Sequence, residues 1–157
     1  MATVGRYGGA GWSTLGSAAG GLAVAAYLTY THYAPGALYC SVGDCGTVQK
    51  SEYSTLGPVP ISILGMLMFV ALIASVVLRA RRPDLEFPVT AAAFAMTLVG
   101  VLYYIYLTYI EIWVLHAVCQ WCVICSLFTL VAFVTESRRL WTGSLAIDGA
   151  DEDLEPA

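Results

Sequence analysis

The chain has 157 residues, of which 59% are hydrophobic and 11% are charged, and its net charge is −4 at pH 7. Soluble domains carry about 25% charged residues, so this composition excludes an ordinary soluble protein. The acidic balance also excludes a basic surface for nucleic acid. With a mean hydropathy of +0.74, the sequence predicts an integral membrane protein that lies in a lipid bilayer.

Four uncharged apolar stretches are each long enough to cross a bilayer core of about 30 Å, which needs about 20 helical residues. They cover about residues 12–33, 59–78, 87–110 and 118–135. Because their connections are short, we expect a single membrane domain over residues 1–146. Its predicted fold is all-α: a bundle of four transmembrane helices with an extracytoplasmic loop between the first two.

The first stretch is rich in small residues. Gly20, Gly21 and the alanines and serines around them predict a surface on which a neighbouring helix packs closely. Ala23-Val24-Ala25 also matches a signal-peptide cleavage pattern. The apolar run continues to Tyr33, which favours a membrane helix over a cleaved signal peptide.

The loop after this stretch contains Cys40 and Cys45. Four residues separate them, Gly43 among them, so a turn can bring their Cα atoms within the roughly 4.4–6.8 Å that a disulfide requires. An isolated extracellular pair is usually a static cross-link. A second cysteine pair at the same membrane level makes a thiol–disulfide relay the alternative.

That second pair is Cys119-Gln-Trp-Cys122, at the start of the fourth stretch. A Cys-x-x-Cys sequence at a helix start places two thiols one turn apart and exposes the first to N–H groups that stabilise a thiolate. A metal or sensor site that includes Cys125 is the alternative, but the chain has only two histidines, His32 and His116. The spacing therefore favours redox chemistry and no metal.

The positions of the basic residues predict the orientation in the membrane. With four spans, all of them except Lys50 fall on the side of both termini. The positive-inside rule then places both termini in the cytoplasm and the redox cysteines at the oxidising outer face. Residues 147–157 hold five of the eleven acidic residues and are expected to form a disordered tail.

These motifs, in this order, resemble the vitamin K epoxide reductase family. The resemblance covers nearly the whole chain, and its form is closest to the short prokaryotic homologues. The residues that carry it are the loop pair Cys40–Cys45, Ser51-Glu-Tyr53, the segment Gly57-Pro-Val-Pro-Ile-Ser-Ile-Leu-Gly65, and Cys119–Cys122.

The resemblance implies a membrane thiol:quinone oxidoreductase that generates disulfides in a prokaryotic plasma membrane. Cys40 would exchange with an extracytoplasmic protein of the thioredoxin-like or DsbA-like type. Cys45 would then form a transient disulfide with Cys119. Cys122 would pass the electrons to a membrane quinone of the menaquinone or ubiquinone type.

The resemblance also implies a quinone site. It places Ser51 and Tyr53 near the quinone. Glu111, at the predicted end of the third helix, is a further candidate there, either as a proton relay or as a solvated boundary residue. Ile61 and Ser126 stand where the vertebrate enzymes carry Asn and Tyr, so plain quinone reduction is favoured over epoxide reduction by a vitamin K epoxide reductase proper.

The sequence is also compatible with a function of another class. The protein could be a non-enzymatic membrane scaffold whose loop is cross-linked by the Cys40–Cys45 disulfide. A scaffold would keep its disulfides unchanged when mixed with a reduced thioredoxin-like protein, whereas an oxidoreductase would exchange them.

Overall fold

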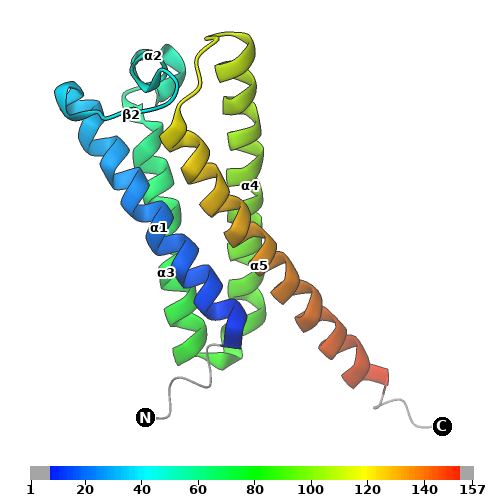
Figure 1. The fold of residues 1–157 in the computed structure, drawn as a ribbon. Coiled ribbons are helices and arrows are strands. Elements are labelled where there is room, and N and C mark those ends of the chain that lie inside the picture. The colour runs from blue at the N-terminus through cyan, green and yellow to red at the C-terminus, as the bar shows by residue number, and fades with distance from the viewer. Residues whose placement is uncertain (1–7, 153–157) are drawn as a thin grey trace.

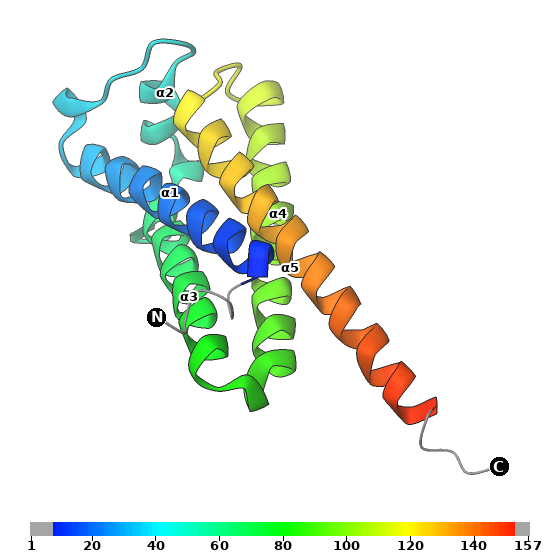
Figure 2. The ribbon, with the colours of Figure 1, turned by 60° about the horizontal axis from the view of Figure 1, so that its bottom comes forward.

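The structure, a computed structural model, describes residues 8–152. Four long helices run beside one another as a bundle (Figures 1 and 2). They are α1 (Gly8–Tyr33), α3 (Ile61–Arg81), α4 (Glu86–Trp113) and α5 (Gln120–Glu152). Helix α1 packs against α3 and α5, and α4 packs against the same two helices. Each of the four predicted apolar stretches overlaps one of these helices, so the predicted all-α class is confirmed.

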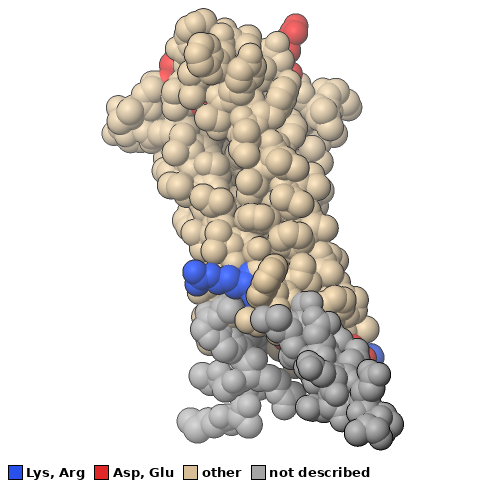
Figure 3. Space-filling view, turned by 90° about the vertical axis from the view of Figure 1, so that its right-hand side faces the viewer, with Lys and Arg blue, Asp and Glu red and all other residues tan. Residues whose placement is uncertain are grey.

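Three helical segments are long and apolar enough to cross a membrane, namely Ile61–Arg81, Pro83–Trp113 and Gln120–Thr142. Within the described part of the chain, α1 does not reach the same hydropathy, because Gly, Ser, Thr and Tyr alternate with its apolar residues. Figure 3 shows a long surface without charged side chains between acidic residues at one end and a group of mainly basic residues at the other. These features indicate a multi-pass membrane protein, and a fourth crossing by α1 stays a prediction.

The glycines of α1 let aromatic rings from two neighbouring helices reach its backbone. A Cβ atom on Gly20 would lie 2.7 Å from the Phe128 ring of α5, and one on Gly21 would overlap the Phe69 ring of α3. Larger residues would therefore force the rings to move. The predicted close packing on small residues is observed. The core around it consists of Ala18, Ala25, Phe69, Leu72, Ala93, Cys125 and Ala132.

The loop between α1 and α3 folds into short elements that cap one end of the bundle (Figure 1). In chain order they are the 3₁₀ helix η2 (Pro35–Ala37), α2 (Cys45–Lys50), the 3₁₀ helix η3 (Glu52–Ser54), and strands β1 (Thr55–Leu56) and β2 (Val59–Pro60). The strands pair antiparallel in the register Thr55↔Pro60 and Leu56↔Val59. The 3₁₀ helix η4 (Pro83–Leu85) joins α3 to α4. None of these short elements is predicted by the apolar patterning of the sequence.

A buried ion pair joins the helices at the end opposite this cap. Nη2 of Arg79 in α3 lies 3.0 Å from Oε1 of Glu136 in α5, and Nη1 contacts the other carboxylate oxygen. Thr14 of α1 donates a 2.9 Å hydrogen bond to Glu136, and Arg79 donates a 3.1 Å hydrogen bond to Thr90 of α4. All four long helices thus contribute to one polar cluster.

Helix α5 extends well beyond the other helices (Figure 2). It runs to Glu152 and so overlaps the predicted acidic tail over residues 147–152. Residues 153–157, the remainder of that tail, lie outside the described residues. Disorder of the tail stays a prediction.

Candidate redox site

The loop carries a disulfide between Cys40 and Cys45, whose Cα atoms are 6.1 Å apart. Cys45 is the first residue of α2 and is fully buried, whereas Cys40 is partly exposed. Asp44 caps α2 by accepting hydrogen bonds from the hydroxyl (2.6 Å) and the backbone N–H (3.1 Å) of Thr47. These bonds, the hydroxyl bond first, lower the pKa of Asp44. The loop therefore holds a disulfide-capable pair, as predicted.

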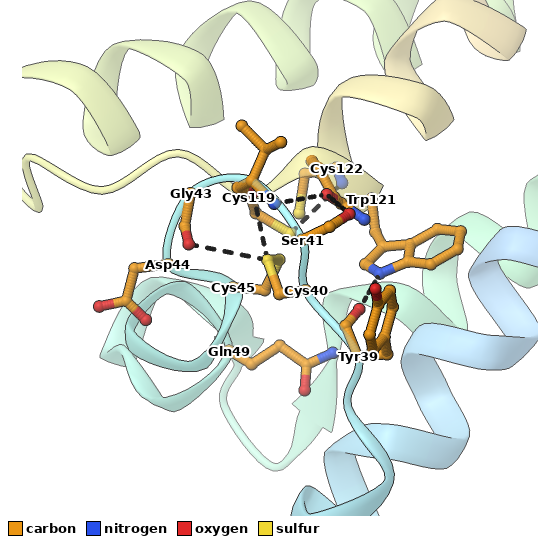
Figure 4. The surroundings of a disulfide bond; sticks show 12 residues. Tyr39, Cys40, Ser41, Gly43, Asp44, Cys45, Gln49, Cys119, Trp121 and Cys122 are labelled. Carbon is orange, nitrogen blue, oxygen red and sulfur yellow. Dashed lines mark hydrogen bonds between the residues drawn. A yellow bond between two sulfur atoms is a disulfide. The ribbon is translucent and has the colours of Figure 1, made fainter.

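The backbone of this loop binds the residues just before α5. The Asp44 N–H donates to the Val118 carbonyl oxygen (3.1 Å), and Gly43 pairs with Cys119 in an antiparallel bridge. Gly43 has a φ of +85°, and a Cβ atom on it would overlap the Val118 carbonyl oxygen. Glycine alone allows both the positive φ and the close approach. The loop disulfide consequently lies beside Cys119 (Figure 4).

The two residues inside the Cys-x-x-Cys motif hold the same loop. Oε1 of Gln120 accepts hydrogen bonds from the Val42 N–H (3.0 Å) and the Ser41 hydroxyl (3.1 Å). Nε1 of Trp121 donates to the Tyr39 carbonyl oxygen at 2.8 Å (Figure 4). The motif therefore carries two thiols and also fixes the position of the loop against them.

Cys119 and Cys122 are free thiols, so the structure has an oxidised loop pair beside a reduced helix pair. Cys119 precedes the first residue of α5 and is fully buried. The backbone N–H of Cys122 donates to Cys119 Sγ at 3.4 Å. Hydrogen bonds from the Cys122 thiol and then from its N–H outweigh burial and lower the pKa of Cys119. Cys119 is thus the sulfur favoured as a thiolate.

Replacing Cys122 with Ala should raise the pKa of Cys119, because Ala removes the thiol donor and keeps the backbone N–H. Only the thiolate reacts with alkylating reagents. The midpoint of the pH dependence of Cys119 alkylation, followed by mass spectrometry with the loop disulfide intact, should therefore move to higher pH. The Ser126→Ala variant, changed on the same helix, should keep the wild-type midpoint. An unchanged midpoint in Cys122→Ala would contradict this assignment.

A pocket lies between the capping loop and the helices, next to Cys122. Its walls are mostly apolar and come from α1, α3, α4, α5 and the loop. All four residues predicted to contact a quinone line this one pocket: Ser51, Tyr53, Glu111 and Cys122. Cys40, Cys45 and Cys119 are not among the lining residues. The structure therefore separates the loop disulfide from the pocket, with Cys119 and Cys122 between them.

Glu111 lies in the last turns of α4 and is 5% exposed, so it is not a solvated boundary residue. Its Oε2 accepts a hydrogen bond from the Cys119 N–H at 3.2 Å, and its carboxyl also interacts with the Cys122 thiol. Its backbone carbonyl oxygen accepts the Ala117 N–H at 3.0 Å. Glu111 is therefore fixed against the start of α5, at the two thiols.

Residues 12–137 match the Vitamin K epoxide reductase family in a comparison with protein-family models. This match covers most of the chain. The protein belongs to the vitamin K epoxide reductase family. No curated protein matches the sequence in a search for relatives. Vitamin K epoxide reductase family members are generally membrane oxidoreductases that act through cysteines, which agrees with the disulfide and thiols found here.

Several pocket residues of this vitamin K epoxide reductase family protein were not predicted from its sequence. His32, Gln49 and Tyr104 line the pocket, but each lies in a different element and no motif joins them. His116 is exposed in the turn before α5 with a φ of +50°, and it does not line the pocket. Over the described residues, no group of three or more His, Cys, Asp or Glu side chains is arranged to hold a metal ion.

Proposed function

We propose that the protein is a membrane thiol:quinone oxidoreductase that generates disulfides in extracytoplasmic proteins. Electrons pass from a reduced protein of the thioredoxin-like or DsbA-like type to Cys40 and Cys45. They then pass to Cys119 and Cys122 and finally to a membrane quinone of the menaquinone or ubiquinone type. Family membership supports the redox class, and the arrangement of the cysteines supports this sequence of steps.

One arrangement carries the proposal: the loop disulfide lies against Cys119, and Cys122 lines an apolar pocket. A relay needs two cysteine pairs in contact and an acceptor site next to the second pair. A static cross-link would need neither the bridge between Gly43 and Cys119 nor the thiols in the motif.

Thiol–disulfide exchanges carry the electrons from the partner to the helix pair. A thiolate of the partner attacks Cys40, and the partner leaves with its own disulfide while Cys40 and Cys45 become thiols. Cys45 then attacks Cys119 of the oxidised helix pair, and Cys40 attacks Cys45 to release Cys119 and Cys122 as thiols. Oxidation of those two thiols supplies the two electrons that convert a quinone to a quinol.

The pocket suits a quinone. A quinone ring is flat and apolar, with a carbonyl oxygen at each end, and small-molecule sites combine apolar walls with a few polar groups. The pocket has apolar walls from residues such as Leu28, Ile61 and Leu107, and polar groups from Ser51 and Tyr104. Ser51 is held in place because its hydroxyl donates to the Val48 carbonyl oxygen at 2.7 Å.

The proposal includes an orientation. With α1 as a fourth crossing, both termini lie in the cytoplasm of a prokaryotic cell, and the cap of the bundle lies at the outer face. The basic residues at the end of α3 and in the second half of α5 support this, because such residues concentrate on the cytoplasmic side. The capping loop would then meet its protein partner in an oxidising compartment.

Anaerobic quinone reduction by the purified protein in detergent, with dithiothreitol as donor, tests the proposal. Wild type should reduce a menaquinone or ubiquinone analogue, whereas Cys122→Ala should fall to the rate of dithiothreitol alone, because no helix disulfide can form. Cys125→Ala removes a thiol that lines the pocket but lies outside the Cys-x-x-Cys motif, so the variant should still show cysteine-dependent reduction. The same reduction rate in Cys122→Ala and wild type would refute the relay.

Failure of the wild type with both quinone classes would favour the scaffold with a static loop disulfide. A second measurement then separates the two functions. The wild-type loop disulfide should exchange with a reduced thioredoxin-like protein in the oxidoreductase, and it should stay intact in the scaffold.

A further inference from the structure

We propose that Glu111 is the proton-transfer residue of the quinone site, taking the proton of the Cys122 thiol and delivering it to a quinone oxygen. This inference rests on the proposed function and adds a catalytic residue to it. The observations that carry it are the burial of the carboxyl, its contacts with both members of the helix cysteine pair, and its place in the pocket wall.

The position of the carboxyl is fixed from both sides. Glu111 belongs to α4, whereas the Cys119 N–H that it binds at 3.2 Å belongs to the chain entering α5. The carboxyl is also within interaction distance of the Cys122 thiol. Both Glu111 and Cys122 line the pocket proposed for the quinone. One carboxyl therefore interacts with the thiol that loses a proton and belongs to the wall of the site where protons are consumed.

A structural role alone does not explain a carboxylic acid at this position. Among the described residues, the ion pair joins Arg79 to Glu136 at the other end of the bundle. No cationic side chain in this part of the protein forms an ion pair with Glu111. A buried carboxyl without a cation is costly. Glutamine could also accept the Cys119 N–H, without that cost. What glutamate adds is the ability to gain and lose a proton.

The balanced reaction defines where that proton goes. As the Cys119–Cys122 disulfide forms, the two sulfurs give two electrons to the quinone, whose two oxygens each gain a proton to become hydroxyls. Glu111 takes the Cys122 proton and passes it to one oxygen, so the carboxyl ends the cycle in its starting state. The thiol proton of Cys119 has gone to solvent, and solvent supplies the second proton.

A single-turnover experiment tests this role. Protein with Cys119 and Cys122 reduced is mixed anaerobically with excess water-soluble ubiquinone analogue, and quinol formation is followed. Loss of a general acid or base typically costs 10²–10⁴-fold, so Glu111→Gln should be slower than wild type by about 100-fold or more. Asp84→Asn, which removes an exposed acid in η4, should match wild type.

Two further measurements distinguish proton transfer from positioning. Glu111→Asp should regain part of the rate, and added formate should accelerate Glu111→Ala, because a small carboxylate can enter the space left in the pocket. Counting alkylated thiols in each variant shows whether the cysteine pairs keep their wild-type redox states. A Glu111→Gln rate close to wild type would overturn the inference, and so would a slow Glu111→Ala that formate does not accelerate.

This experiment also separates the inference from the proposed function. If wild type reduces the quinone in a cysteine-dependent way and Glu111→Gln does so equally fast, only the role of Glu111 is refuted. If wild type does not reduce the quinone at all, the proposed function fails and the role of Glu111 fails with it.

Discussion

The double variant Cys40→Ala/Cys122→Ala is expected to form a Cys45–Cys119 disulfide in nearly all molecules on mild oxidation. It keeps one cysteine from each pair, and both of these residues are fully buried at the contact between the loop and the start of α5. The Gly43–Cys119 bridge holds this contact, and the variant has neither Cys40 nor Cys122 to reverse the new bond. Peptide mapping by mass spectrometry would identify the linked pair.

The control is the double variant Cys45→Ala/Cys122→Ala, which leaves Cys40 with Cys119. Cys40 is partly exposed and lies five residues before the start of α2, so its disulfide with Cys119 should form in a much smaller fraction of molecules. Because Cys125 is present in both variants, any cross-link that it forms affects both measurements equally. Equal cross-linking in the two variants would contradict the assignment of Cys45 as the cysteine that meets Cys119.

Local sequence features predicted the helices and the cysteine pairs because each depends on neighbouring residues. The apolar stretches at 59–78, 87–110 and 118–135 correspond to helices with enough hydropathy to cross a membrane. The spacing of Cys40 and Cys45 sufficed for a disulfide. The family resemblance added Ser51 and Tyr53, which spacing alone would have left as ordinary loop residues.

Contacts between residues distant in sequence could not be predicted in the same way. Gln120 and Trp121 bind the loop about 80 residues earlier, since their bonds reach Val42, Ser41 and Tyr39 (separations of 78, 79 and 82 residues). No pattern in the sequence pairs these positions, because the contacts arise only once the loop lies on α5. The sequence left the role of Glu111 open between a proton relay and a solvated boundary residue, and its burial appears only in the fold.

The pair formed by Arg79 and Glu136 is another contact of this kind, because its members lie 57 positions apart in the sequence. The pair lies far from the cysteines, at the other end of the helices. Its loss should therefore reduce the stability of the fold and leave the chemistry of the redox site intact. In each folded molecule of a variant at this pair, the oxidised loop pair and the reduced helix pair should persist.

Arg79→Met should destabilise the protein by about 3–5 kcal/mol, because removing one member of a buried ion pair leaves the other charge buried without its hydrogen-bonded partner. Glu136 is fully buried, and after the change the Thr14 hydroxyl still donates a 2.9 Å hydrogen bond to it. The free energy of unfolding would be measured by denaturant titration of the protein in detergent micelles. Arg81→Met, which changes an exposed arginine two residues later in α3, should alter stability little.

The double variant Arg79→Met/Glu136→Met completes the test. Apolar residues of similar volume often replace a buried ion pair without loss, so the double variant should be more stable than Arg79→Met. Such a recovery would show that the cost in the single variant comes from the isolated carboxylate. If the double variant is as unstable as the sum of the two single variants, the two side chains do not interact energetically, and the cluster does not join the four helices through this pair.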